Sequence, residues 1–348
     1  MRVYKDHLIN KGSSVKQALE LLNILAPDSI LFVVDDEEKL IGSLTDGDVR
    51  RGLLNNYTVA DMIDEIIQPN PRFINKGENN IKKIIAYREE LLRILPVVDE
   101  KMRVINVINF RTIKSYLPID AVIMAGGRGQ RLRPLTDITP KPLLEIGNKP
   151  IIEHNLDRLI SYGINDFWIS VKYLGKQIEN YLGNGKDKNV KIEYVWETEP
   201  LGTIGAISNI TNFEHNYILV TNSDLLTTID YESFFLDFIN HDADIAVLTI
   251  PYKVNIPYAV LETKNQIINS LKEKPTYTYY SNGGVYLMKK NILDYIPKDS
   301  FFNTTDLIEL LIKRNHKVIS FPFSGYWLDI GKHEDFEKAQ SDIKNINL

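Results

Sequence analysis

Three glycines, three arginines and a lysine lie within one short segment, between positions 126 and 141. They follow an apolar run, residues 119–125, which predicts a buried strand. Glycine lets backbone N–H groups come close to phosphate oxygens, and arginine offers forked donors that match phosphate. The segment therefore predicts a phosphate-binding loop. It has neither the Gly-Lys-Ser/Thr ending of a P-loop nor the G-x-G-x-x-G spacing, which disfavours a nicotinamide cofactor.

Strand-like and helix-like segments alternate around this loop and must position whatever it binds. The strand candidates are residues 119–125, 166–171, 191–196, 216–221, 244–250, 284–288 and 317–321. The helix candidates are residues 151–162, 176–182, 203–210, 231–240, 305–314 and 334–343. This alternation predicts an α/β domain with a mostly parallel sheet, in which ligands sit at the carboxyl ends of the strands.

Two similar segments precede the loop. Asp35 in the first corresponds to Asp99 in the second, 64 residues later. Each segment predicts a helix, a hairpin and a second helix, and each is too small to bury both faces alone. A seam near residues 116–118 separates this α+β module, expected at 1–115, from the α/β domain expected at 119–348.

The composition is that of a globular protein with no extreme charge. The 348 residues include 41 Lys and Arg against 46 Asp and Glu, a net charge of −5, which disfavours a nucleic-acid-coating protein. The absence of cysteine excludes disulfides and zinc–thiolate sites. No long apolar run and no N-terminal apolar h-region are present, so a cytoplasmic protein without a membrane partner is expected.

The loop segment resembles the signature of the sugar-1-phosphate nucleotidyltransferases, also called nucleoside-diphosphate-sugar pyrophosphorylases. That family's pattern reads G-G-x-G-x-R-L-x-P-L-T and then P-K-P-L-L, which is present at residues 126–136 and 140–144. Further family segments follow in the same order, at residues 199–206, 221–224, 273–275, 282–286 and 327–331. The resemblance covers about residues 119–345 and implies a Rossmann-like (GT-A-like) nucleotidyltransferase domain.

The resemblance also implies the reaction, the cofactor and the catalytic residues. A sugar 1-phosphate would attack the α-phosphorus of a nucleoside triphosphate, and pyrophosphate would leave. Arg131 is implied to hold the pyrophosphate and Lys141 to steady the phosphates. Asp224 and Asp329 are implied as the Mg²⁺ pair, since carboxylate oxygens are the ligands that Mg²⁺ prefers.

The resemblance assigns substrate binding to positions spread over the whole domain. These are Ala125, Gly126, Gly127, Glu199, Gly202, Glu273, Lys274, Asn282 and Gly283. The L-G-T-x-G-A form at 201–206 favours GTP, with UTP, CTP or dTTP as alternatives. The family often has an aromatic-Gly-Val segment at the sugar, and Ala259 replaces that glycine here, which leaves the sugar open.

The N-terminal repeat resembles a pair of cystathionine-β-synthase-type (CBS) domains. The first unit carries Thr45 and Asp48 in the Thr-x-x-Asp pattern that bonds a ribose in that family, and the second unit lacks it. The resemblance implies an adenine nucleotide as a regulatory partner at one site, or a structural module, and a homo-oligomer. The same fusion resembles enzymes of bacterial surface-glycan (legionaminate-type) pathways, for which glucosamine 1-phosphate is the favoured sugar.

Two other interpretations remain. The chain would be a non-catalytic CBS nucleotide sensor if the nucleotide-binding fold were degenerate, but Arg131, Lys141, Asp224, Lys274 and Asp329 are all present. A cytidylyltransferase acting on a phosphocholine-like substrate would share the fold. The Glu-Lys-Pro and Asn-Gly-Gly segments favour a sugar instead.

Overall fold

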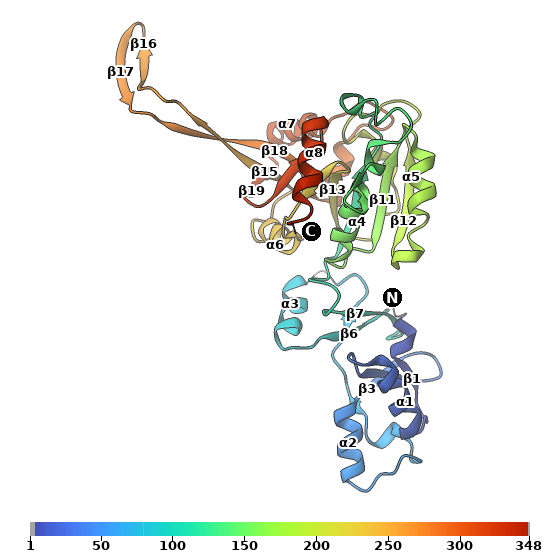
Figure 1. The fold of residues 1–348 in the computed structure, drawn as a ribbon. Coiled ribbons are helices and arrows are strands. Elements are labelled where there is room, and N and C mark those ends of the chain that lie inside the picture. Colours follow the sequence, from blue (N-terminus) through green and yellow to red (C-terminus); the bar gives the residue numbers. More distant parts are fainter. Residues whose placement is uncertain (1–3, 79, 347–348) are drawn as a thin grey trace. The chain divides into compact units, whose positions relative to one another are not determined.

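The computed structural model describes residues 4–78 and 80–346 and divides into two compact units (Figure 1). Unit 1 takes the chain up to Pro118 together with Ile160–Gly163. Unit 2 takes Ile119–Leu159 and the chain from Ile164 onward. The ends of the two expected modules, residues 1–3 and 347–348, lie outside the described residues. No helix in the described ranges is long and apolar enough to cross a membrane.

Unit 1 consists of two small sheets with three helices. Its elements are η1 (Tyr4–His7), β1 (Leu8–Asn10), α1 (Val15–Leu25), β2 (Ile30–Val34), β3 (Leu40–Thr45), α2 (Asp46–Leu54), η2 (Ile63–Glu65), β4 (Gln68–Pro69), β5 (Ile74–Asn75), α3 (Ile81–Glu89), β6 (Ile94–Val98) and β7 (Val104–Asn109). The sheets have the orders β1-β2-β3-β4 and β5-β6-β7. Phe32 and Val34 of the first hairpin pack with Ile94 and Val98 of the second, so the two halves of unit 1 share a buried core.

The second half of unit 1 lacks the closing helix that the repeat predicts. Strand β7 ends at Asn109, and β8 begins only ten positions later, at Ile119. The Asn109 side chain accepts a hydrogen bond from the Arg111 backbone at 2.9 Å, and its carbonyl accepts one from Thr112 at 3.0 Å. The expected helix–hairpin–helix unit is therefore wrong for the second half, because these turns and Pro118 occupy the segment where a helix would begin.

Unit 2 is built around a seven-stranded sheet. Its elements are β8 (Ile119–Met124), η3 (Gln130–Leu132), η4 (Lys141–Leu143), β9 (Glu145–Ile146), β10 (Lys149–Pro150), α4 (Ile151–Ile160), β11 (Asp166–Val171), α5 (Gly175–Leu182), η5 (Lys186–Lys188), β12 (Lys191–Trp196), η6 (Gly205–Asn209), β13 (Tyr217–Asn222), β14 (Leu225–Thr227), α6 (Tyr231–Asn240), β15 (Ile245–Asn255), β16 (Val260–Lys264), β17 (Ile267–Lys272), β18 (Thr276–Lys289), η7 (Lys290–Tyr295), α7 (Thr304–Lys313), β19 (Val318–Pro322), β20 (Trp327–Asp329) and α8 (His333–Asp342). The sheet order is β12-β11-β8-β13-β18-β15-β19. Only β18 pairs antiparallel with its neighbours, which confirms the expected α/β class with a mostly parallel sheet.

The segment 203–210, expected as a helix, forms only the short 3-10 helix η6. The backbone N–H groups of Ile204 and Gly205 both bind the carbonyl of Phe302 at 3.2 Å. These bonds tie the start of the segment to the distant 300–303 loop, so its donors do not face an open helix N-terminus. Apolar spacing indicated the buried face correctly, since Ile204 and Ile207 are fully buried, but not the type of helix.

Four segments distant in sequence meet in one apolar cluster beneath the expected site. Leu132 follows the glycine loop, Leu226 lies on β14, Leu328 lies on β20, and Ala339 lies on α8, and all are buried in this cluster. Each fully buried Leu or Ile side chain contributes about 1.5–3 kcal/mol. Apolar packing in this cluster therefore holds the glycine loop and strands β14 and β20 in place.

Strands β15 and β18 continue past the sheet as a two-stranded ribbon, which ends in the β16–β17 hairpin (Figure 1). We call residues 250–281 the arm. Its stem contains six consecutive antiparallel pairs, from Ile250–Ser281 to Asn255–Thr276, which corresponds to about 20 Å. The sequence did not indicate these long strands, because the alternation of polar and apolar residues there resembles an ordinary edge strand.

Candidate active site

A cavity of about 1220 Å³ opens at the carboxyl ends of β8, β11, β12 and β13. Its walls come from the glycine loop, from the residues that follow each of these strands, and from Phe301. The lining residues are Met124, Gly126, Gly127, Arg128, Gly129, Gln130, Arg131, Lys141, Pro142, Lys172, Tyr173, Leu174, Glu197, Thr198, Glu199, Pro200, Gly202, Thr203, Asn222, Ser223, Asp224, Phe301 and Gly331. Ligand sites at this edge are what a doubly wound sheet predicts.

The glycine loop is held in one shape. Gly129 has a φ of 60°, and a Cβ there would meet side-chain atoms of Lys141 and Thr136 at 3.0 Å. Its carbonyl accepts a hydrogen bond from Thr136 Oγ1 at 2.9 Å, and the Tyr173 hydroxyl donates to the Thr136 carbonyl at 3.0 Å. A Cβ on Gly127 would meet nothing within 4 Å. The loop is therefore rigid where it turns, with open space beside Gly127.

Asp224 and Asp329, which are 105 residues apart in sequence, come together through a short β-ladder. Strand β14 pairs antiparallel with β20, and Leu225 lies opposite Asp329. The backbone N–H of Ile330 also donates to the Asp224 carbonyl at 3.0 Å. Backbone hydrogen bonds between β14 and β20 bring the two aspartates together. The types of the two side chains alone therefore do not predict that they meet.

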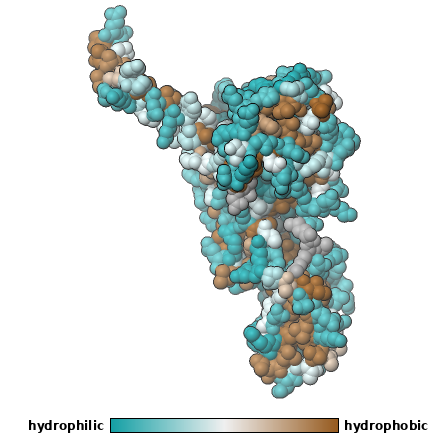
Figure 2. Space-filling view, in the orientation of Figure 1, coloured by the Kyte–Doolittle hydropathy of each residue, from teal (hydrophilic) through white to brown (hydrophobic). Residues whose placement is uncertain are grey.

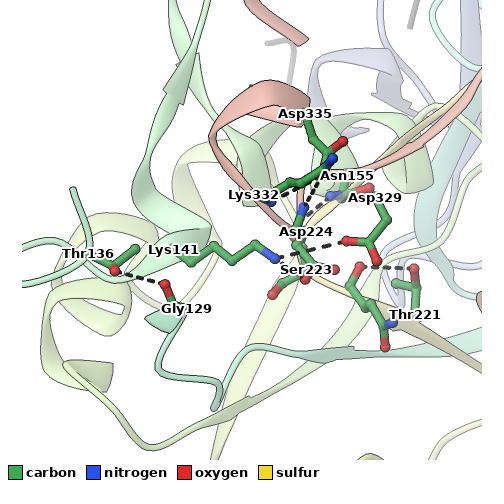
Figure 3. Close-up of polar contacts among 12 residues, drawn as sticks. Gly129, Thr136, Lys141, Asn155, Thr221, Ser223, Asp224, Asp329, Lys332 and Asp335 are labelled. Carbon is green, nitrogen blue, oxygen red and sulfur yellow. Dashed lines mark hydrogen bonds and ion pairs between the residues drawn. The ribbon is translucent and has the colours of Figure 1, made fainter. Parts of the chain in front are cut away.

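The Lys141 side chain extends toward both carboxylates (Figure 3). Its Nζ is 2.5 Å from Asp224 Oδ2 and 4.0 Å from Asp329 Oδ1. Lys141 is only 8% exposed, so its ammonium group depends on these partners for compensation. Burial raises the pKa of Asp329, and the Asp224 carboxylate adds to the rise. The positive charges of Lys141 and Arg131 act in the opposite direction and lower the pKa of Asp329.

Each carboxylate keeps one buried oxygen without a hydrogen-bond partner, Oδ1 of Asp224 and Oδ1 of Asp329. A buried carboxylate oxygen without a donor carries a desolvation cost that a cation would remove. Two such oxygens, one just before β14 and one at the end of β20, fit a hard divalent cation. Asp224 and Asp329 would hold it.

Arg131 and Glu199 both line the cavity. Arg131 follows the glycine loop in η3, and a Cβ on Gly331 would lie 3.3 Å from its guanidinium. Glu199 is exposed, and its carboxylate is 4.0 Å from Lys172 Nζ. Gly202 has a φ of 80°, and a Cβ there would meet the Phe302 carbonyl at 2.5 Å, so only glycine fits that turn.

Lys172 and Glu197 line the cavity but were not among the predicted residues. Each directly follows a parallel strand, β11 or β12. Glu197 accepts hydrogen bonds from Ser170 Oγ at 2.5 Å and from the Leu201 backbone at 3.0 Å, so it fixes the wall beside Gly126. The rule that ligands sit at the carboxyl ends of strands indicates both positions.

Ala125, Asn282 and Gly283 lie beyond the cavity lining. Ala125 is buried, and its N–H donates to the Ser170 carbonyl at 2.8 Å. Asn282 Oδ1 accepts hydrogen bonds from the Gly284 backbone at 3.0 Å and from the Tyr286 hydroxyl at 2.9 Å. The Gly283 carbonyl accepts from Trp327 Nε1 at 2.8 Å. In this structure these residues shape the strands around the site.

Glu273 and Lys274 lie on the arm, and neither lines the cavity. They connect β17 to β18, and both are exposed to solvent. The stem holds this connection beyond the end of the sheet. The structure therefore does not bring these two residues together with Lys141, Asp224 and Asp329.

A separate group at the amino ends of the strands, Asp120, Asp166 and His215, has the spacing of metal ligands. Asp120 is buried, and it accepts hydrogen bonds from the His215 backbone at 2.9 Å and binds its ring Nδ1 at 2.8 Å. Burial raises the pKa of Asp166, and the Asp120 carboxylate adds to the rise. The group lies at the edge of the sheet opposite the cavity, and within it Asp120 and His215 bind each other.

Thr45 and Asp48 form a helix cap in unit 1. Thr45 is the N-cap of α2, and the two residues complete a capping box. Asp48 is 3% exposed; its Oδ2 binds the Thr45 hydroxyl at 2.6 Å, and its Oδ1 binds Gln68 Nε2 at 2.9 Å and the Arg51 guanidinium. Burial would raise the pKa of Asp48, but these hydrogen bonds lower it below its ordinary value.

Comparison with known families agrees with this arrangement. The nucleotidyl transferase family model matches residues 120–346, and the CBS domain model matches residues 7–55. The chain therefore belongs to the nucleotidyl transferase family and carries a CBS domain in its N-terminal part. The resemblance to the nucleotidyltransferases and the presence of a CBS domain are confirmed, whereas the second CBS unit of the expected pair stays a prediction.

The relatives include several guanylyltransferases. A mannose-1-phosphate guanylyltransferase of Mycobacterium tuberculosis is 31% identical over 234 residues, which is 65% of this chain and 64% of that protein. A D-glycero-alpha-D-manno-heptose 1-phosphate guanylyltransferase of Aneurinibacillus thermoaerophilus is 32% identical over 231 residues, which is 65% of this chain and 99% of that protein. The chain thus spans less than two thirds of the length of the mycobacterial relative.

Solved structures give the same family. HddC from Yersinia pseudotuberculosis has a TM-score of 0.51 and 30% identity, covering 64% of this chain and 99% of that chain. A putative glucose-1-phosphate thymidylyltransferase from Bacillus anthracis, in complex with a sucrose, has a TM-score of 0.53 and 26% identity, covering 66% of this chain and 97% of that chain.

Proposed function

We propose that this chain transfers a nucleotidyl group from a nucleoside triphosphate to a sugar 1-phosphate, forming a nucleoside-diphosphate sugar and pyrophosphate. One observation carries the proposal. Lys141, Asp224 and Asp329 converge from three distant segments beside a rigid glycine loop, and two carboxylate oxygens there lack hydrogen-bond partners. A phosphoryl-transfer site needs this combination of a cation, a metal-binding acid pair and open backbone.

The chemistry follows from the placement of the residues. An oxygen of the sugar 1-phosphate attacks the α-phosphorus, a new P–O bond forms, and the bond to the β-phosphate oxygen breaks, so that pyrophosphate takes the electron pair. Arg131 neutralises the leaving pyrophosphate, and Lys141 the phosphate next to Asp224. Asp224 and Asp329 would hold a bound Mg²⁺, which would neutralise phosphate charge. The glycine loop and the Glu199–Gly202 turn would frame the nucleotide.

GTP and glucosamine 1-phosphate are the proposed substrates. The guanylyltransferase relatives and the L-G-T-x-G-A segment support guanine. Glucosamine rests on the resemblance to surface-glycan enzymes alone. UTP-, CTP- or dTTP-dependent transfer to another sugar is the alternative within the same reaction.

A pyrophosphate-release assay with Mg²⁺ tests the proposal. GTP, UTP, CTP, dTTP and ATP are each combined with glucosamine-, N-acetylglucosamine-, mannose- and glucose-1-phosphate. We expect one pair to be turned over at least ten times faster than the rest, and we expect it to contain GTP. Folded protein that released no pyrophosphate from any pair would contradict the proposal and favour a nucleotide sensor.

We further propose that unit 1 takes an adenine nucleotide at Thr45 and Asp48, as its CBS domain suggests. A ribose would have to exchange the hydrogen bonds that Asp48 makes to Thr45 and Gln68. Binding would alter catalysis only if the nucleotide favoured one of two conformations of the protein. Deletion of residues 1–115 tests the module: unchanged kinetics, nucleotide response and assembly would contradict both a regulatory and an assembling role.

A further inference from the structure

A second cavity lies within unit 1. It has a volume of about 290 Å³ and is formed by the start of β3, the β4–β5 connection, α3 and the turn between β6 and β7. The lining residues are Leu40, Ile41, Asn70, Pro71, Arg72, Phe73, Lys83, Tyr87 and Met102. This volume is close to the lower end of the range of about 300–1,000 Å³ that small-molecule sites usually have. The cavity can therefore hold a small organic molecule.

The cavity is separate from the two residues that are expected to bind a ribose. Leu40 begins β3 and Thr45 ends it, and five residue steps along a strand correspond to about 17 Å. Neither Thr45 nor Asp48 is among the lining residues. A ligand in this cavity would therefore use different side chains from a ligand at the cap of α2.

One part of the lining is apolar and is held in place by the fold. Leu40 is buried, and Phe73 and Met102 pack against the same cluster that joins the two halves of unit 1. The Met102 carbonyl accepts a hydrogen bond from the Leu40 backbone at 2.9 Å, which fixes the β6–β7 turn against β3. Figure 2 shows apolar and hydrophilic residues side by side on the visible face of unit 1, and the cavity lining has the same mixed character.

Two cations of the lining lie over one aromatic ring. The Arg72 guanidinium carbon is 5.7 Å from the centre of the Tyr87 ring, and Lys83 Nζ is 5.9 Å from it. Lys83 also pairs with Glu78 at 2.9 Å. Within the described ranges, the Arg72 side chain has no carboxylate partner and no hydrogen bond. The lining thus carries two positive charges and no negative charge, which favours an anion.

The first half of unit 1 has the same fold without these two cations. The registers of β1 and β5 make His7 the counterpart of Arg72, and positions counted from the helix caps make Gln17 the counterpart of Lys83. His7 is buried, and its Nδ1 bonds the Ile30 carbonyl at 3.0 Å. Gln17 completes the capping box of α1. The side chains of the first half therefore serve the fold, whereas Arg72 and Lys83 have donors left for a ligand.

We propose that the cavity of unit 1 binds a small anion with a planar, apolar body. Arg72 and Lys83 bind its carboxylate or phosphate, since a guanidinium offers two parallel donors to either group. The planar body contacts Tyr87, Phe73 and Met102. An aromatic carboxylate and a nucleoside monophosphate share this chemistry. The inference does not rest on the proposed function, because no residue of the unit 2 cavity takes part in it.

Calorimetric titration of the full chain tests the affinity. The probes are 1-naphthoate, UMP and inorganic phosphate, of which 1-naphthoate has no ribose. We expect 1-naphthoate or UMP to bind with a dissociation constant below about 1 mM, and inorganic phosphate, which has no apolar body, to bind at least about tenfold more weakly.

Two substitutions and a matched control connect the affinity to the cations. Arg72→Gln and Lys83→Gln should each weaken the binding, Arg72→Gln by at least about tenfold, because its guanidinium has no other ionic partner. Lys82→Gln should leave the dissociation constant unchanged. Lys82 is the neighbour of Lys83 on α3, is exposed, and lies outside the lining.

Thiol labelling tests the location. The chain contains no cysteine, so Met102→Cys places a unique thiol in the lining, and Met62→Cys places one on the surface of unit 1, where Met62 is 62% exposed. With the probe at about ten times its dissociation constant, maleimide labelling of Met102→Cys should slow by about tenfold. Labelling of Met62→Cys should not change. Thermal unfolding of both variants checks that each is folded.

The outcomes separate the alternatives. Binding that Arg72→Gln weakens, with protection of Met102→Cys, supports the inference; binding of 1-naphthoate alone would indicate a carboxylate ligand, and binding of UMP alone a phosphate ligand. Binding that neither Arg72→Gln nor Lys83→Gln weakens, equal protection of both thiols, or no binding of any probe would overturn it. A protein that releases no pyrophosphate but binds a probe here would contradict only the proposed function.

Discussion

Two aspartates that the sequence assigned to ligands, Asp48 of unit 1 to a ribose and Asp224 of unit 2 to Mg²⁺, have opposite surroundings. Both oxygens of Asp48 are bound, to Thr45, Gln68 and Arg51. Asp224 has Lys141 on one oxygen and no partner on the other. The first carboxylate therefore has its hydrogen-bonding capacity used by the fold, and the second has capacity left for a ligand.

Asp224→Asn should produce the largest effect. An amide cannot supply the negative charge that the metal and Lys141 require, so we expect turnover to fall by at least about 10³-fold with little change in melting temperature. Pyrophosphate release and thermal unfolding measure the two quantities. Asp242→Asn serves as the control, because the Asp242 side chain is 88% exposed and lies away from the cavity lining. Near-normal turnover by Asp224→Asn would remove this residue from the catalytic machinery.

Lys141→Gln should come next, with turnover reduced by about 10²-fold. The variant removes the ammonium group that lies within 4.0 Å of both carboxylates, so added Mg²⁺ should raise its melting temperature more than that of the wild type. Lys338→Gln removes a comparable lysine, paired with Asp342 at 2.6 Å on the surface, and should change neither quantity. Equal Mg²⁺ responses in both variants would contradict the expectation that Lys141 compensates the charge of the two carboxylates.

Asp48→Asn should act on stability instead of chemistry. It weakens a buried cap with several donors, so we expect the free energy of unfolding of unit 1 to fall by about 1–3 kcal/mol. Asp61→Asn is the matched control, since Asp61 receives the same two hydrogen bonds from Thr58 but is exposed. Denaturant unfolding measures both, and AMP and ATP titrations of each variant test the regulatory proposal. Loss of an adenine-nucleotide response with unchanged stability would show that Asp48 serves a ligand.

The acid response should be the smallest effect. The pKa of Asp48 is lower in the folded chain than the ordinary value, so ionised Asp48 stabilises unit 1 above pH about 4. That contribution disappears as the pH falls through the folded pKa. The stability difference between wild type and Asp48→Asn should therefore shrink below pH 4. A difference that stayed constant down to pH 2 would mean that the charge of Asp48 does not stabilise the cap.

Sequence patterns predicted the sheet better than its connections. Strands 166–171 and 191–196 match the structure, because buried parallel strands form compact apolar runs between turns. The 203–210 helix failed because the Phe302 carbonyl, a hundred residues away, captures its first donors. The short strands β14 and β20 have no local sequence pattern that predicts a strand. The convergence of Asp224 and Asp329 was therefore predicted only from the resemblance to a family.

The same resemblance named Glu273 and Lys274 but did not indicate where they lie. Local alternation predicts a strand whether or not another layer covers it, and it says nothing of how far a ribbon extends. Lys172 and Glu197 are the opposite case, because their place in the fold could be predicted although neither belongs to one of the family motifs. Both follow from the rule that ligands sit at the carboxyl ends of strands.

The β14–β20 ladder has a consequence for synthesis. Residue 329 leaves the ribosome 105 residues after residue 224, a delay of roughly 5–20 s at usual elongation rates. Until β20 arrives, Asp224 and Lys141 have no second carboxylate beside them, and β14 has no partner strand. The nascent chain can therefore complete its glycine loop early, yet it holds no assembled acid pair until almost all of unit 2 has been translated.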